Sequence, residues 1–245
     1  MPDLPYGAHK LHEPKGKTLK ILVVGAFPAD STFAHAINMF KTANGFNRLG
    51  HEVTLICRGP LRTPISPSEI RERYGLDSRV NVLYPQLKPL QHLIPSRLSE
   101  WRRSQRSRSY EGELVKLARE IAPDVSYCRA FFESIALAKA GIPVIVESHA
   151  PPGATSQALH RMSDAFRTEP NLLRLITIHP RLADGFINRG VDADVIRVVP
   201  DGVDLELFTP PPMHVKRESS RFRITYTGSL ETYKGIDTIL ASAAL

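Results

Sequence analysis

The sequence lacks the features that mark membrane-spanning, secreted and disulfide-stabilised proteins. No apolar run approaches the ~18 residues that a membrane span needs, and the longest, such as residues 21–27, are strand-sized. Charged and polar residues stand at the N-terminus, where a signal peptide would have an apolar core. The two cysteines, Cys57 and Cys128, are too few for a disulfide framework. We therefore expect a cytoplasmic protein with reduced thiols.

Several motifs of nucleotide-dependent and metal-dependent enzymes are also missing. The turn at residues 25–30 has one glycine where a dinucleotide-binding fingerprint needs three. The chain contains neither a phosphate-binding P-loop nor a G-x-S-x-G nucleophile motif, and its nine histidines do not combine with cysteine at zinc spacing. Asp192 and Asp194 match a D-x-D metal pattern, but they precede a strand, which favours a solvated turn. We expect no metal and no resident cofactor.

The charge of the chain is unevenly distributed. The formal net charge is +7, and much of this excess lies in one short segment that holds Arg97, Arg102, Arg103, Arg106 and Arg108. Such a segment favours an anionic partner, either phosphate groups or an anionic membrane surface, although a solvated basic helix is the simpler alternative. Nucleic acid is not expected, because only Trp101 and Tyr110 stand nearby as aromatic residues that could stack on bases.

Apolar runs of strand length alternate with stretches of helical spacing. We expect strands at residues 19–25, 52–57, 80–84, 125–128, 143–147, 172–178 and 194–199. The intervening helices are predicted at residues 33–49, 96–122, 131–140, 155–166 and 180–188. A strand that follows a helix in this way pairs in parallel with the strand before it. The fold class is therefore α/β, with a doubly wound, mostly parallel, Rossmann-like sheet.

The composition also divides the chain. Residues 1–18 have no periodicity and are expected to form a flexible leader, and residues 19–208 hold the alternating pattern. Residues 209–220 begin with Thr209 and three prolines, which favours a stiff linker. Residues 221–245 contain one expected strand, at 221–227, and a helix from 234. So short a segment cannot enclose a core, so we expect an incomplete second Rossmann-like domain.

Candidate site residues follow the strands, since ligands of parallel sheets bind beyond the carboxyl ends of the strands. Glu147 and His149 end one strand, and alternation directs both side chains to the same face. A carboxylate beside an imidazole can orient it for proton transfer or hydroxyl recognition, whereas a capping histidine is the structural alternative. On the first helix, His35, Asn38 and Lys41 share one flank. Asn38 could bind a hydroxyl or carbonyl group and Lys41 a phosphate, or the three residues could form an ordinary polar face.

A second candidate site lies near the C-terminus. Gly228 and Ser229 form an expected turn, and Lys234 begins the helix that follows. Free backbone N–H groups, the positive end of a helix and a lysine together favour a pyrophosphate. The segment 198–204, which contains Asp201, is interpreted as a turn through which the chain leaves the strand expected at 194–199, with a structural role only.

These last segments carry a family resemblance. VVPDGVDLELF (198–208), the Pro-rich spacer and TYTGSLETYKGIDTIL (225–240) resemble the interdomain signature of family 4 glycosyltransferases. Residues 31–59, 124–151 and 172–191 are similar to further segments of that family. The resemblance implies the GT-B fold, with an N-terminal acceptor domain followed here by the start of the C-terminal donor domain. It also implies a retaining enzyme that transfers sugar from a nucleotide-diphosphate sugar to a glycan, lipid or small-molecule acceptor, without a metal.

The resemblance further implies roles for single residues. His149 matches the catalytic histidine that contacts the transferred sugar, and Lys234 matches the lysine that binds the donor pyrophosphate beside Gly228 and Ser229. Ser229 stands where many members have arginine. The resemblance places Asn38 and Lys41 on the acceptor-side helix, and His35 and Glu147 are further candidates for the acceptor or sugar side.

The family's E-x7-E motif would lie beyond Leu245. We therefore expect this chain to be inactive alone. The alternative is a non-enzymatic module that binds an acceptor or a membrane.

Overall fold

The computed structural model describes residues 16–60, 65–85, 99–149, 157–203, 224–228, 230 and 234–243, with helix backbone only at 99–108 and 157–158. The chain divides into two units, Met1–Asp201 and Gly202–Leu245. The expected linker begins at residue 209, outside the described residues, so this domain boundary stays a prediction. The leader is likewise described only from residue 16.

The first unit is built on a sheet of seven strands. These are β1 (Lys20–Pro28), β2 (Glu52–Arg58), β3 (Asn81–Leu83), β4 (Val125–Cys128), β5 (Val144–Ser148), β6 (Leu172–Thr177) and β7 (Ile196–Val198). Their order is β3-β2-β1-β4-β5-β6-β7, and every neighbouring pair is parallel. The sheet confirms the α/β, doubly wound, Rossmann-like class. The order reverses between β1 and β4, which is where ligands collect in such sheets.

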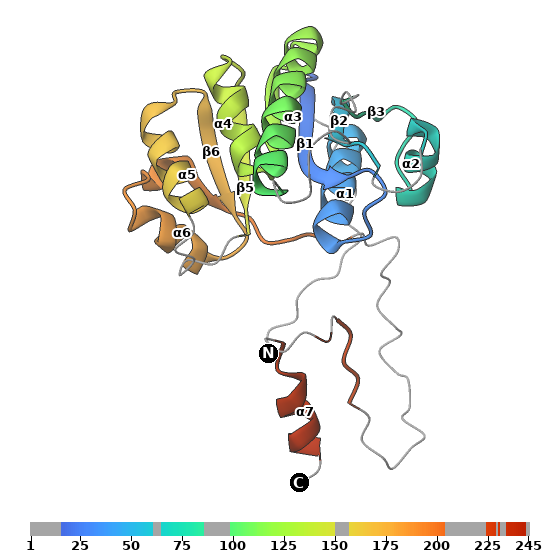
Figure 1. Ribbon diagram of the computed structural model, residues 1–245, viewed down its shortest axis with the longest axis vertical. Helices are drawn as coiled ribbons and strands as arrows, with labels where there is room; N and C mark the ends of the chain where they lie inside the picture. The colour runs from blue at the N-terminus through green and yellow to red at the C-terminus, as the bar shows by residue number, and fades with distance from the viewer. Residues whose placement is uncertain are drawn as a thin grey trace. The chain divides into compact units, whose positions relative to one another are not determined.

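Helices cover both faces of this sheet (Figure 1). They are α1 (Ala34–Arg48), α2 (Pro67–Tyr74), α3 (Ser99–Ile121), α4 (Phe131–Lys139), α5 (Gln157–Thr168) and α6 (Pro180–Ile187), with a short 3-10 helix, η3 (Ala193–Val195), before β7. Side chains alternate along β1, so Leu22 and Val24 join the core under α3, α4 and α5. Ile21 and Val23 join the second core under α1 and α2.

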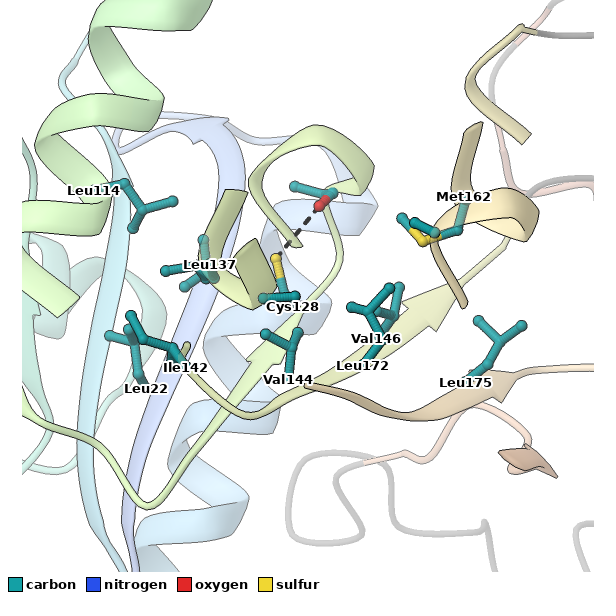
Figure 2. Close-up of a cluster of buried hydrophobic side chains, with 14 of the residues drawn as sticks. Leu22, Leu114, Cys128, Leu137, Ile142, Val144, Val146, Met162, Leu172 and Leu175 are labelled. Carbon is teal, nitrogen blue, oxygen red and sulfur yellow. Dashed lines mark hydrogen bonds between the residues drawn. The ribbon is translucent and has the colours of Figure 1, made fainter. Parts of the chain in front are cut away.

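The core under α3, α4 and α5 is dominated by aliphatic side chains (Figure 2). Cys128 lies among them and donates its thiol proton to the carbonyl oxygen of Ala130, at 3.4 Å. Both cysteines are free and buried, and burial raises the pKa of Cys57 and of Cys128 to about 12. The buried thiols therefore contribute to packing.

Several element boundaries differ from the sequence expectations. Helix α2 was not anticipated, although Ser66 and Glu69 form a capping box at its start and Pro67 occupies its first turn. The strand expected at 194–199 is shorter, at Ile196–Val198. The Asp192 side chain accepts a hydrogen bond from the N–H of Asp194 and caps η3, which occupies the start of the expected strand. Asp192 and Asp194 therefore form a turn, as predicted.

In the second unit, α7 (Ile236–Ala243) confirms the expected helix. The described part of the strand expected at 221–227, residues 224–227, has no strand pairing. Within the described residues, no helix combines the length and apolarity needed to cross a membrane.

Candidate functional site

The site lies at the carboxyl end of β5, where Glu147 and His149 are in direct contact. An oxygen of the Glu147 carboxylate (Oε1) forms a hydrogen bond with the ring nitrogen Nε2 of His149. The His149 side chain is 18% exposed and that of Glu147 only 5%. Strand alternation thus places the two side chains together, as the sequence indicated. The pair therefore places an imidazole, oriented by a buried carboxylate, at the carboxyl end of a central strand.

The buried Glu147 carboxylate has two further partners, both from β4 or its end. The Tyr127 hydroxyl donates to Glu147 Oε2 at 2.5 Å, and Arg129 Nε lies 3.9 Å from Glu147 Oε1. A carboxylate at this depth needs such partners, because burial without them is strongly unfavourable. Tyr127 and Arg129 supply the partners that a carboxylate at this depth needs.

A second carboxylate approaches the same histidine from the exit of β7. Asp201 Oδ1 lies 3.7 Å from His149 Nε2, and the same oxygen accepts a hydrogen bond from Asn38 Nδ2 of α1 at 3.0 Å. We call Tyr127, Arg129, Glu147, His149 and Asp201 the His149 cluster. It joins residues from the ends of β4, β5 and β7, and Asn38 links it to α1.

The other two candidates on α1 lie in different surroundings from Asn38. The His35 ring lies edge-on to Phe27 and stacks on Phe33. Loss of hydration and, second, the charge of Arg129 lower the pKa of His35. The ammonium group of Lys41 lies beside Gly75 at the end of α2. The polar flank of α1 therefore does not converge on a single point.

The donor-side candidates belong to the second unit. Gly228 has a φ of 155°, a backbone conformation that other residues rarely adopt, so glycine suits this turn. Lys234 stands two residues before α7, whereas the sequence placed it at the first position of that helix. Ser229 lies outside the described residues. The phosphate-binding role of these residues stays a prediction.

The arginine segment is described only in part. Arg102, Arg103, Arg106 and Arg108 lie on the backbone of α3, which confirms the expected helix there. Their side chains and the whole of Arg97 lie outside the described residues. The proposed membrane contact is therefore a matter for experiment.

One group in the described part of the chain has the donor set of a metal site. The ligand atoms of Glu147, His149 and Asp201 lie within 4.8 Å of one another. Each of these side chains already takes part in a hydrogen bond, and Arg129 adds a positive charge beside Glu147. A cation would have to displace the bond between Glu147 and His149 and would be repelled by Arg129. We interpret the group as a hydrogen-bonded cluster.

Sequence reasoning missed three members of the cluster: Tyr127, Arg129 and Asp201. Tyr127 pairs with Ile145 across β4 and β5, and its hydroxyl reaches the residue two places further along β5. Strand parity could have placed Tyr127, Ile145 and Glu147 on one face once that register was known. Asp201 was interpreted as part of a structural turn, yet its carboxylate faces His149.

Comparisons with known proteins agree with this fold. The sequence model of Glycosyltransferase Family 4 matches residues 39–207, which is more than half of the chain. The structure of Anabaena Alr3699/HepE in complex with UDP-glucose is similar with a TM-score of 0.53 at 15% identity, covering 79% of this chain and 47% of that one. Sucrose-phosphate synthase from Thermosynechococcus elongatus is similar with a TM-score of 0.56 at 12% identity, covering 78% and 50%.

These similarities concern part of each larger structure. This chain spans about half the length of the solved structures that it matches. A search among curated proteins found no match. At such low identity the structural likeness establishes the fold, and the family match rests on the sequence.

Proposed function

This chain belongs to glycosyltransferase family 4, and from that membership we propose that its first unit is the acceptor-side half of a retaining glycosyltransferase. The reaction would transfer a sugar from a nucleotide-diphosphate sugar to a glycan, lipid or small-molecule acceptor. The contact between Glu147 and His149 at the end of β5 carries the proposal. It presents an oriented imidazole at the sheet edge where ligands of such sheets bind.

We assign His149 to the transferred sugar, because one of its nitrogens is held by Glu147 and the other can meet a hydroxyl group. Asn38, His35 and Lys41 are proposed for the acceptor side, together with Glu147. Lys234, Gly228 and Ser229 are proposed for the donor phosphates. The similar structure of HepE was solved in complex with UDP-glucose, which supports a nucleotide sugar as the class of donor proposed for this chain.

The proposed reaction is a front-face displacement. The acceptor hydroxyl forms a new bond to the anomeric carbon on the side from which the nucleoside diphosphate leaves. The bond from that carbon to the diphosphate oxygen breaks, and the acceptor proton passes to this oxygen. Lys234 would stabilise the negative charge that develops on the leaving group. No step requires a metal, so EDTA should leave the rate unchanged.

The test uses the longest protein that can be expressed from the reading frame containing these residues. Release of nucleoside diphosphate is measured with UDP-, GDP- and ADP-sugars in turn. One donor should support turnover, and His149→Ala should lower kcat/KM about 100-fold or more. His160→Ala is the matched control, because His160 is an exposed histidine on α5, outside the His149 cluster. Normal turnover by His149→Ala would refute the assignment.

The same assay on the 245-residue chain tests whether it is inactive alone. A chain that binds acceptor or vesicles but never turns over, in any expressed form, would instead be the binding module.

Membrane contact is proposed at the cytoplasmic face, through Arg97 and the arginines of α3. Replacing Arg102, Arg103, Arg106 and Arg108 with glutamine should abolish sedimentation with anionic vesicles, since each arginine contributes about 1 kcal/mol. Equal binding of the wild-type chain to neutral vesicles would exclude this contact.

A further inference from the structure

Three side chains of the His149 cluster form a continuous hydrogen-bonded chain, from Tyr127 through Glu147 to His149. We propose that Tyr127 is a positioning residue, which fixes the Glu147 carboxylate so that His149 presents its Nδ1 atom to the sugar as a hydrogen-bond acceptor. The proposal rests on the glycosyl-transfer function given above. It adds a residue from β4 whose hydroxyl bonds to Glu147, the carboxylate that holds His149.

The carboxylate of Glu147 is held at both oxygens. Oε2 accepts from the Tyr127 hydroxyl, and Oε1 is bonded to His149 Nε2. A carboxylate with one bonded oxygen can still rotate about its terminal torsion, which is a soft degree of freedom. Two bonds in different directions remove that freedom. Tyr127 thus sets the direction in which Oε1 points, and Oε1 sets the orientation of the imidazole ring.

The bond to Glu147 also decides which ring nitrogen carries the proton. An ionised carboxylate can only accept hydrogen bonds, so the nitrogen facing it must be an N–H. Asp201, a second carboxylate, lies 3.7 Å from the same Nε2 and favours the proton there as well. In the neutral ring, Nδ1 is then left with a lone pair. A sugar hydroxyl could donate to it.

Tyr127 is itself well placed to remain a donor. Its ring lies edge-on to Phe46 of α1, with the ring centroids 5.3 Å apart, which braces the phenol between helix and sheet. Burial and the negative charge of Glu147 raise the pKa of Tyr127 well above its ordinary value. The hydroxyl therefore keeps its proton throughout the pH range in which such an enzyme works.

The first test observes the bond directly, in the 245-residue chain with 15N-labelled histidine. A hydrogen-bonded imidazole N–H exchanges slowly with water, so the Nε2 proton of His149 should give a visible resonance. His149→Asn identifies that resonance by its loss. Absence of the resonance from the spectrum of the wild-type chain would refute the proposal without any substitution at Tyr127.

Tyr127→Phe then removes only the hydroxyl group. The Nε2–H resonance should shift or broaden, because the carboxylate loses the bond that holds Oε2 and is restrained only through Oε1, by His149 and Arg129. The matched control is Tyr84→Phe, since the Tyr84 hydroxyl donates to the Ile65 carbonyl oxygen at 2.6 Å, outside the cluster. It should leave the resonance in place. If Tyr127→Phe also leaves it in place while circular dichroism shows a folded chain, Tyr127 does not position His149.

A kinetic readout follows in whichever expressed form turns over. Tyr127→Phe should lower kcat roughly tenfold, the loss expected from one hydrogen bond, while KM for the donor changes little. Tyr84→Phe should change neither constant. A form with no turnover on any donor contradicts the proposed function, whereas the resonance still tests the positioning role. The two failures are therefore distinguishable.

Discussion

Asn38 on the first helix donates a hydrogen bond to Asp201, which stands 163 positions later at the end of the first unit. The bond is 3.0 Å long, and the Asp201 oxygen that accepts it is the one that faces His149 at 3.7 Å. The first helix therefore restrains the second carboxylate of the His149 cluster. Helix α1 contributes to the candidate site through a partner from the far end of the sheet.

Asn38→Ala should affect the site more than the fold. The exposed bond is expected to contribute only about 0.5–1 kcal/mol to the free energy of unfolding, while the loss of restraint on Asp201 should lower kcat several-fold. Thermal denaturation and initial-rate assays measure the two effects. Asn171→Ala is the control, since Asn171 Nδ2 donates to the Ala138 carbonyl oxygen at the same distance of 3.0 Å, away from the cluster. Equal effects of both variants on kcat would contradict the expected role of Asn38.

Gly25→Ala should destabilise the exit of β1. A Cβ atom at Gly25 would lie 2.0 Å from the ring of Phe27, which is buried against Phe40. The ring would have to move, at an expected cost of about 1–3 kcal/mol in the free energy of unfolding. Urea denaturation provides the measurement.

Gly45→Ala is the matched control for that substitution. Gly45 lies inside α1, and nothing stands within 4 Å of its Cβ position. Alanine should stabilise the helix there by about 0.5–1 kcal/mol, because glycine is the poorer helix former. If both variants shifted stability in the same direction, the close approach of Phe27 would not be the cause.

Glu133→Ala should lower stability by breaking an ion pair between β2 and α4. The Glu133 side chain is 3% exposed, and its carboxylate oxygen lies 3.0 Å from Arg58 Nη2. The guanidinium group of Arg58 also lies over the Tyr110 ring. Arg58 is 41% exposed, so water can partly solvate it once the partner is lost. We expect a loss of about 2 kcal/mol, below the usual cost for a fully buried pair.

Glu120→Ala is the comparison for this loss. Glu120 is an exposed glutamate on α3, where alanine favours the helix. The free energy of unfolding of the Glu120→Ala variant should differ from that of the wild type by less than about 0.5 kcal/mol. A similar loss in both variants would show that the pair with Arg58 does not stabilise the fold.

His35 should make the stability of the first unit depend on pH. Its pKa is lowered in the folded chain, so the unfolded chain takes up a proton first as the pH falls below about 6.5. The stabilisation is present above that pH and is lost as the pH falls toward the lowered value. His35→Gln lacks this term, so the difference in free energy of unfolding, wild type minus variant, should fall from pH 7.5 to 5.5.

Arg129→Gln should weaken the dependence on pH, because the charge of Arg129 is the second cause of the lowered pKa. Denaturation in urea at each pH gives the values for all three proteins. If the difference between wild type and His35→Gln were constant over this range, protonation of His35 would not be coupled to folding.

The order of elements was largely predictable from local patterns. Each strand appears as an apolar run and most helices as a periodic one, because burial between layers requires these patterns. The missed helix α2 is short and polar, with only Ile70 and Tyr74 buried, so it has little apolar periodicity. Its capping residues were the better signal.

The site was predictable only where its residues are close in sequence. Glu147 and His149 lie on one strand, so alternation was enough to place them together. Tyr127 reaches Glu147 through the pairing of β4 with β5, and Asp201 reaches His149 from the end of β7. Such contacts depend on sheet order and register, which a single sequence does not specify. Arg129 was visible in the sequence, but its proximity to Glu147 was not.

The two buried cysteines offer a measure of how the first unit opens. Cys57 lies in β2 and Cys128 in β4, the two strands that flank β1. The thiolate is the form that attacks an alkylating reagent, and neither residue provides it while it is buried with a pKa of about 12. Modification must therefore wait until a central strand separates from its neighbour. The rate of alkylation at each cysteine would report the opening of the two sides of β1 separately.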